Sequence, residues 1–177
     1  MFTDQQQRTL VEIARSAVAR AVAGTGSGAV AVIAGLPEAT GAFVTLKKHG
    51  ELRGCIGTLE CRRALPEEVA RVAVSAALED PRFQPVSVAE LNDLDIEISV
   101  LGPLEQIDPL DPSAIEIGRH GLVVEQSGRR GLLLPQVATE WGWDRQAFLD
   151  QTCVKAGLPR NCWRTGATVY RFTAVVF

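Results

Sequence analysis

The sequence lacks any apolar run long enough to cross a bilayer, since none approaches the ~20 consecutive residues that a membrane span needs. Its first ten residues, MFTDQQQRTL, also lack the basic start, apolar centre and small-residue cleavage site of a secretory signal. We therefore expect a cytoplasmic protein that does not bind membranes. In that compartment its four cysteines should be reduced.

Several motifs that hold metals or phosphates are missing. The four cysteines form no CxxC pair, and their spacing matches neither a zinc site nor a small disulfide framework. No HExxH or GxSxG occurs, and the glycines of residues 24–28 lack the lysine and hydroxyl residue of a P-loop. A metal site built from Cys55, His120 and Glu97 has no local cluster of ligands to support it. The sequence thus identifies no metal and no cofactor.

Basic residues are neither abundant nor concentrated. The chain has 18 basic and 21 acidic residues, a net charge of −3, and its only adjacent arginines are Arg62-Arg63 and Arg129-Arg130. Nucleic-acid-binding domains usually carry a basic face, so we do not expect direct binding of DNA or RNA. Histidine is equally scarce, with only His49 and His120 available for proton transfer near neutral pH.

What is present indicates one soluble globular domain that contains both helices and strands. A length of 177 residues suits a single domain covering 1–177, with a smaller lobe within about 102–137. Apolar periodicity and capping residues predict several helices and strands. The helices are expected at 4–22, with Asp4 as cap, at 66–78, at 87–91, with a Ser87–Glu90 capping box, at 136–141 and at 144–155. The strands are expected in a hairpin over 41–60 that turns at His49-Gly50, and at 96–100, 122–124, 132–134 and 168–177, while residues 102–112 are expected to form a loop.

The most unusual stretch is residues 52–58, LRGCIGT, the second strand of a hairpin that turns at His49-Gly50. Alternation along a strand places Arg53 and Cys55 on one face, so a thiol and a fixed positive charge would lie together. A nearby cation favours a reactive thiolate. The other interpretation is that Cys55 is a small buried hydrophobic residue.

Glycines and a proline-rich loop accompany this strand. Gly54 and Gly57 weaken a strand interior, and such glycines often mark a bulge or a place where a ligand or another segment comes close. The loop 80–85, DPRFQP, is stiff because of its prolines, and its Asp80 and Arg82 are polar residues that could line a cleft or simply pair with each other.

A general base for Cys55 would have to be a histidine. His49 lies six residues away, roughly 20 Å along an extended strand at ~3.3 Å per residue, so only a distant segment can fold back onto the thiol. His120, in the Gly-Arg-His-Gly segment, is therefore the better candidate. A single histidine in a turn is more often structural, and both interpretations remain open.

Six short motifs in this order resemble the AMMECR-one domain family, whose prokaryotic members are called AmmeMemoRadiSam system protein A. They are LRGCIG at 52–57, DPRFQP at 80–85, His120-Gly121, Leu134-Pro135, GWD at 142–144 and KAG at 155–157. The resemblance implies an α+β fold, an antiparallel sheet packed with helices, with a larger and a smaller lobe. The family's naming also implies partners, a Memo-like protein and a radical S-adenosylmethionine (SAM) enzyme.

Two functions follow as expectations. The first is an accessory module that binds a ligand or partner through a cleft at the LRGCIG strand, lined by Gly54, Gly57, Asp80 and Arg82. The second is a thiol-dependent enzyme in which Cys55 is the nucleophile or redox residue, Arg53 stabilises the thiolate or an anionic substrate, and His120 moves a proton. We favour the first, because the second needs three residues to meet that lie far apart in the sequence.

Overall fold

The computed structural model describes residues 2–26 and 28–177, which form two compact units. The first unit contains the chain up to Leu101 together with Val175–Phe177, and the second contains Gly102–Ala174. Both combine helices with antiparallel strands, so the predicted α+β class is confirmed. The smaller lobe predicted within about 102–137 covers only the first half of the second unit.

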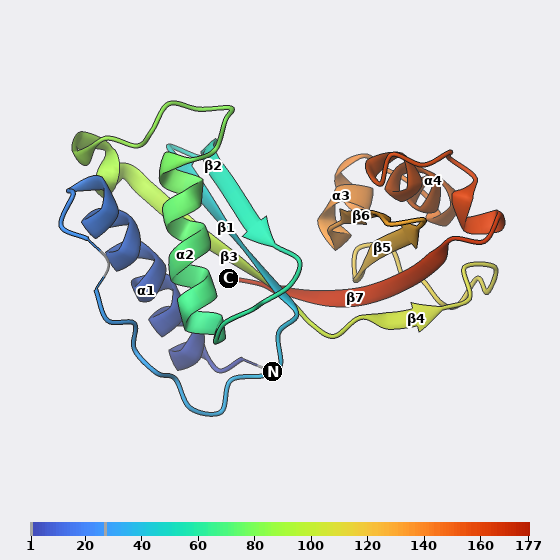
Figure 1. The fold of residues 1–177 in the computed structure, drawn as a ribbon, viewed down its shortest axis with the longest axis horizontal. Coiled ribbons are helices and arrows are strands. Elements are labelled where there is room, and N and C mark those ends of the chain that lie inside the picture. Colours follow the sequence, from blue (N-terminus) through green and yellow to red (C-terminus); the bar gives the residue numbers. More distant parts are fainter. Residues whose placement is uncertain (1, 27) are drawn as a thin grey trace. The chain divides into compact units, whose positions relative to one another are not determined.

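In the first unit, two helices pack against a sheet with the strand order β2–β1–β3 (Figure 1). The strands are β1 (Gly41–Lys48), β2 (Glu51–Thr58) and β3 (Leu94–Leu101), and the helices are α1 (Asp4–Val22) and α2 (Leu65–Leu78). Backbone hydrogen bonds between Ile98 and Phe177 also join the end of the chain to β3. Apolar side chains from α1, α2, β1 and β3 form one core between these layers.

Local sequence signals explain most of these boundaries. His49 and Gly50 both adopt positive φ, 52° and 83°, as the predicted two-residue hairpin turn requires. Helix α1 begins as predicted, but its cap is Thr3 and not Asp4, because the Thr3 hydroxyl accepts the Gln6 N–H and the Gln6 side chain accepts the Thr3 N–H. Of the helices in the described ranges, none has the length and apolarity to cross a membrane.

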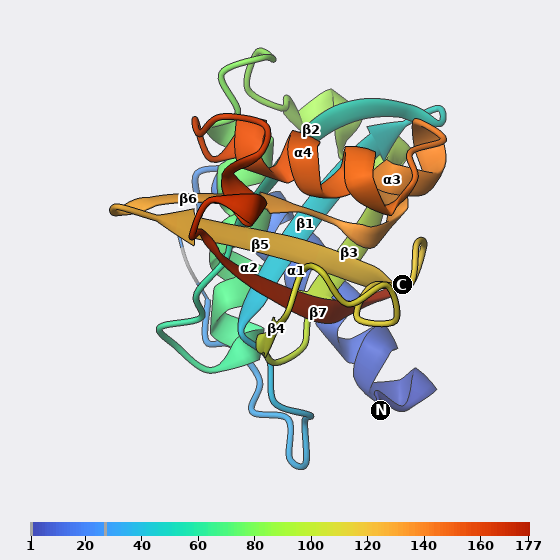
Figure 2. The same ribbon diagram turned by 90° about the vertical axis from the view of Figure 1, so that its right-hand side faces the viewer.

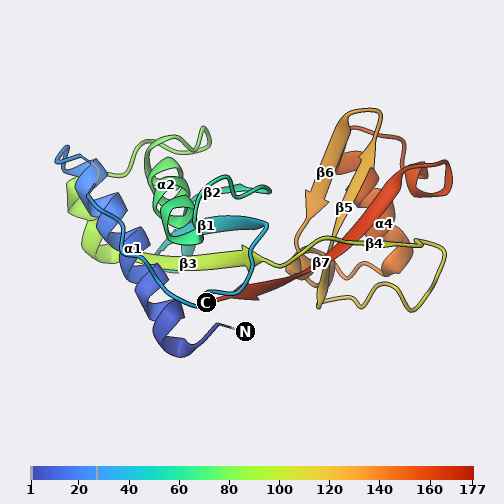
Figure 3. The ribbon, with the colours of Figure 1, turned by 60° about the horizontal axis from the view of Figure 1, so that its bottom comes forward.

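In the second unit the strands pair in the order β4–β7–β5–β6, and the unit has its own core. Its elements are β4 (Glu105–Ile107), β5 (His120–Gln126), β6 (Arg129–Leu133), α3 (Pro135–Glu140), α4 (Arg145–Lys155) and β7 (Thr168–Val176). Helices α3 and α4 lie against β5 and β6 (Figures 2 and 3). Strand β4 falls in a stretch expected to be loop, because its pairing with the distant β7 leaves no local signal.

Two short 3-10 helices complete the structure, η1 (Val88–Asp93) in the first unit and η2 (Cys162–Arg164) in the second. The cysteine expectation was wrong, because Cys153 and Cys162 form a disulfide. Gly157, with φ 72°, ends α4 and reverses the chain, so that η2 returns to the last turn of the helix. Both cysteines are fully buried in the second core, whereas Cys55 and Cys61 are free.

Candidate functional site

The LRGCIG sequence runs along β2, which pairs with β1 on one side and lies at the end of the strand order. A β-bulge interrupts this pairing. Leu46 lies opposite Gly54 while Lys47 lies opposite Leu52, so Arg53 is the extra residue. The bulge therefore lies directly before Gly54, one of the two glycines at which a bulge or a close approach was expected.

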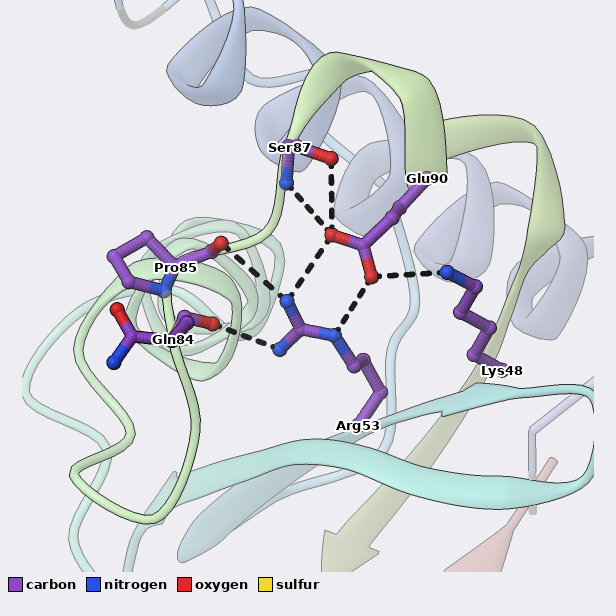
Figure 4. A network of polar contacts seen from close by, with 6 residues as sticks. All are labelled: Lys48, Arg53, Gln84, Pro85, Ser87 and Glu90. Atoms are coloured by element: carbon purple, nitrogen blue, oxygen red, sulfur yellow. Dashed lines mark hydrogen bonds and ion pairs between the residues drawn. The ribbon is translucent and has the colours of Figure 1, made fainter.

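The bulge turns the Arg53 side chain toward η1 and the 84–85 segment (Figure 4). Its guanidinium donates to both carboxylate oxygens of Glu90, Nε to Oε1 at 3.0 Å and Nη2 to Oε2 at 3.1 Å. It also donates to the backbone carbonyls of Gln84 and Pro85, at 2.9 and 3.3 Å. Through these four hydrogen bonds, Arg53 holds the 84–85 segment beside η1.

Glu90 is the centre of this network and was not recognised as a partner of Arg53 from the sequence. Its hydrogen bonds with Arg53 come first among the causes that hold the pKa of Glu90 well below its ordinary value, followed by the Ser87 N–H and the Lys48 ammonium. The predicted capping box between Ser87 and Glu90 is present. The same carboxylate thus caps η1 and binds two cations.

Cys55 lies away from this network. It is opposite Thr45 on β1, and the Thr45 hydroxyl donates to Sγ at 3.2 Å. Thr45 and Lys48 are three residues apart on a regular strand, so they face opposite sides, and Lys48 is the residue that shares Glu90 with Arg53. The prediction that Arg53 and Cys55 share a face is therefore wrong, because the bulge interrupts the alternation.

Arg82, not Arg53, is the cation next to Cys55. Its Nη2 donates to the Cys55 carbonyl at 3.3 Å, while the Cys55 N–H donates to Oδ2 of Asp80 at 2.9 Å. Asp80 and Arg82 also form a two-pronged ion pair, Nε to Oδ1 at 2.9 Å and Nη2 to Oδ2 at 2.7 Å. The predicted Asp80–Arg82 pairing is confirmed, and together the two side chains bind both outward backbone groups of Cys55.

The two members of this ion pair differ strongly in exposure, and each shifts the pKa of the other. The Asp80 carboxylate is 2% exposed, whereas the Arg82 side chain is 55% exposed. The hydrogen bond from Arg82 is the largest cause that holds the pKa of Asp80 far below its ordinary value, with the Cys55 and Arg82 N–H groups adding to it. The pKa of Arg82 is raised, first by the same hydrogen bond and also by the negative charge of Asp80.

Gly54 and Gly57 do permit close approaches, but the approaching groups belong to this chain. A Cβ atom at Gly54 would lie 2.2 Å from the Ala76 carbonyl oxygen of α2. A Cβ atom at Gly57 would lie 2.2 Å from the Phe43 ring and 2.6 Å from the Ala42 carbonyl oxygen. Packing of α2 and Phe43 onto β2 therefore accounts for both glycines.

His120 lies in the second unit, as the first residue of β5. It is 9% exposed, and its Nδ1 accepts the Glu116 N–H at 3.0 Å. Burial lowers the pKa of His120, and the charges of Arg171 and Arg119 lower it further, so the ring is neutral at pH 7. This hydrogen bond gives His120 a structural role within its own unit, while Cys55 belongs to the other unit.

The second free thiol, Cys61, interacts with the buried carboxylate of Glu68. Burial, followed by the charge of Glu68, raises the pKa of Cys61. Glu68 itself is fully buried and bonded to Arg71 and to the Arg62 N–H, a role with no clear sequence signal. Within residues 2–26 and 28–177, no group of three His, Cys, Asp or Glu side chains is arranged to hold a metal ion.

Proteins of similar sequence occur in archaea. The chain is 49% identical over 179 residues to a protein of Methanothermobacter thermautotrophicus, covering 96% of this chain and 92% of that one. It is 50% identical over 149 residues to a protein of Thermococcus onnurineus, covering 79% of this chain and 73% of the relative. The names of these relatives do not state an activity.

A solved structure has the same fold. The crystal structure of the uncharacterized protein PH0010 from Pyrococcus horikoshii matches with a TM-score of 0.88 and 40% sequence identity, covering 99% of this chain and 92% of that chain. The AMMECR1 family model matches residues 11–177, nearly the whole sequence. The resemblance carried by the six sequence motifs is thereby confirmed, and the chain belongs to the AMMECR1 family.

Proposed function

We propose that this protein is an accessory module that binds a ligand or partner protein at the β2 surface, which we define as Asp80, Arg82 and Phe83, beside Cys55 on β2. In this proposal the partners are a Memo-like protein and a radical SAM enzyme. The proposal draws on the family resemblance for the partners and on the chemistry of the surface for the place of binding.

The observation that supports this proposal is the state of Arg82. Asp80 fixes the guanidinium through Nε and Nη2, yet more than half of the side chain is exposed, and no hydrogen bond of the described residues uses Nη1. The guanidinium also lies 5.5 Å from the centre of the Phe83 ring. An exposed arginine already held in one geometry loses little conformational entropy when it binds a carboxylate or phosphate.

The alternative is a thiol-dependent enzyme that uses Cys55. One observation favours it: Cys55 is a free, half-buried thiol with Arg82 beside it. Against it, the two other residues assigned to this mechanism have structural partners, Arg53 with Glu90 and His120 with the Glu116 N–H. The binding function needs no general base and is therefore the better supported of the two.

The two functions are separated by comparing Arg82→Ala with Cys55→Ser. If β2 is a binding surface, Arg82→Ala weakens binding to the purified Memo-like or radical SAM protein by about tenfold or more, a loss of about 1.4 kcal/mol per factor of ten. Cys55→Ser and the exposed control Arg8→Ala should bind as the parent does. Binding is measured by calorimetry, with circular dichroism to confirm that each variant is folded.

A thiol assay completes the test. In a Cys61→Ser background, Cys55 is the only thiol outside the disulfide, so its rate of alkylation can be followed alone. Fast alkylation at pH 7, together with loss of partner-dependent activity in Cys55→Ser and normal binding by Arg82→Ala, would reject the binding function in favour of the enzyme. Slow alkylation with the expected loss of binding in Arg82→Ala supports the accessory module.

A further inference from the structure

Charge is segregated along the sequence of the second unit, which does not contain the β2 surface. The unit carries eight acidic and eight basic residues and so has no net charge. Residues 105–116 contain four carboxylates and no cation, whereas residues 155–164 contain three cations and no carboxylate. The adjacent Arg129-Arg130 adds two more cations at the turn between β5 and β6.

Packing brings these cations to one end of the unit. Gly131 packs against α4, since a Cβ atom there would lie 2.3 Å from the Ala156 nitrogen. On the other side of the turn, the Gln126 side chain donates to the Thr165 carbonyl at 3.2 Å. We call the resulting group the basic cluster, and all of its members are exposed: Arg129, Arg130, Lys155, Arg160 and Arg164.

The basic cluster is held in place by the structure beneath it. Arg129 donates to the Gly157 carbonyl at 2.6 Å, and the Arg164 guanidinium lies 4.0 Å from the centre of the Trp163 ring. The Cys153–Cys162 disulfide closes the loop that carries Lys155 and Arg160. Cations fixed in this way lose little entropy when they bind an anion.

Two carboxylates lie nearby, and they do not neutralise the cluster. Asp150 accepts the Trp163 Nε1 hydrogen bond at 2.7 Å, so it helps to hold the ring on which Arg164 stacks. Glu125 lies opposite Arg130 across the β5–β6 pair and offsets one charge. Five cations against these two carboxylates leave an excess of positive charge.

We infer that the basic cluster is a docking surface for an acidic segment of a partner protein, independent of the β2 surface. Four of its five cations are arginines, whose planar guanidinium groups match carboxylates in pairs. Because the unit has no net charge, the basic cluster attracts an anionic partner only over short distances. This favours a partner with a compact group of carboxylates.

A nucleic acid fits this surface less well. Binding to DNA or RNA normally draws on a net positive field, and this chain has a net charge of −3. Single strands also need exposed aromatic rings for stacking. At the basic cluster the aromatic side chain is Trp163, which is 4% exposed and lies beneath Arg164.

The test uses a fluorescein-labelled deca-glutamate peptide and a labelled DNA duplex, with the full chain in its oxidised form. We expect the peptide to bind and its affinity to fall as NaCl rises from about 50 mM to about 200 mM. The double variant Arg130→Glu/Arg164→Glu should weaken binding by about tenfold or more. A double variant of matched charge in the first unit, Arg8→Glu/Arg62→Glu, should bind within about twofold of the parent, since exposed charges outside the binding site contribute little.

A second readout locates the peptide. The chain has three tryptophans, so its indole N–H groups give three resolvable resonances. The Trp163 resonance should shift on titration with the peptide, while those of Trp141 and Trp143 stay in place. Three results would overturn the inference: equal losses in both double variants, tighter binding of the duplex than of the peptide, or binding that leaves Trp163 unchanged. Loss of Memo-like partner binding in Arg82→Ala has no bearing on this surface.

Discussion

Arg53 is the extra residue of the bulge in β2, and this position decides what its charge does. In a regular strand its guanidinium would lie beside the Cys55 thiol. The bulge directs it to Glu90 instead, where it joins β2 to η1. The cation beside the thiol comes from Arg82, 27 residues from Cys55 in the sequence.

At Gly54 the packing of α2 leaves no room for a side chain. We predict that Gly54→Ala lowers the free energy of unfolding by about 1–3 kcal/mol, because its new Cβ atom would overlap the fixed Ala76 carbonyl oxygen. Urea unfolding followed by far-ultraviolet circular dichroism measures the change. Leu52→Ala is the control on the same strand, and with a side chain 44% exposed it should cost clearly less. Equal losses in both variants would contradict this account.

At the scale of elements, the segment between Cys153 and Cys162 shows how a covalent link supports a region with little regular structure. Within it α4 ends at Lys155, and η2 begins only at Cys162. The disulfide closes a short loop, which restricts the unfolded chain more than the folded one. Its burial within the second core adds packing to this effect.

Replacing both cysteines should therefore destabilise the second unit. We predict that Cys153→Ala/Cys162→Ala lowers the free energy of unfolding by about 2–3 kcal/mol, the chain-entropy value for a loop of this length. Tryptophan fluorescence measures it, since all three tryptophans lie in this unit. Dithiothreitol should destabilise the parent but not the variant. Four free thiols in the unreduced, denatured parent, in place of the two from Cys55 and Cys61, would disprove the link.

Elements with strong local signals were predictable from the sequence. The His49-Gly50 turn, the Ser87–Glu90 capping box and the Asp144 cap of α4 all lie within a few residues of the structure that they specify. The disulfide and β4 were missed, because one depends on a chain reversal and the other on a segment distant in the sequence. A bulge was one interpretation of Gly54, but its effect on the direction of Arg53 was missed, because that effect depends on the register of β2 against β1.

The candidate site follows the same division. The Asp80–Arg82 pair could be predicted, since a short acid–base spacing is a local pattern. The close approach of other groups to Gly54 and Gly57 could be predicted in the same way, from glycines inside a strand. The partner of Arg53 could not be predicted, because Glu90 lies 37 residues away in the sequence. The same is true of the basic cluster, whose cations come from a hairpin turn and from the segment after α4.

At the scale of the whole molecule, two low-pKa carboxylates tie the 80–90 segment to the first unit. Asp80 and Glu90 stay ionised in the folded chain, while in the unfolded chain their pKa values return to about 3.8 and 4.5. The unfolded chain therefore binds more protons below those values. By linkage, their contribution to stability is present above about pH 4.5 and is lost as the pH falls below it.

Acid unfolding should follow these two groups. We predict that the free energy of unfolding of the parent falls between about pH 5 and about pH 3, and that Asp80→Asn/Glu90→Gln is less stable at neutral pH but depends less on pH. Urea titrations at each pH, followed by circular dichroism, measure both slopes. Glu60→Gln, at a carboxylate that is 71% exposed, should behave as the parent does. An equally steep slope in the double variant would show that other groups control acid stability.

The Asp80–Arg82 pair has one more consequence, for how separate copies of the chain behave in solution. An outer strand normally offers its free N–H and C=O groups as a template on which another molecule can add a strand, and such pairing leads to aggregation. At Cys55 both of these groups are already bound by the ends of two side chains. Those ends cannot continue a ladder of backbone hydrogen bonds. The Asp80–Arg82 ion pair therefore prevents a second molecule from adding a strand to β2 at Cys55.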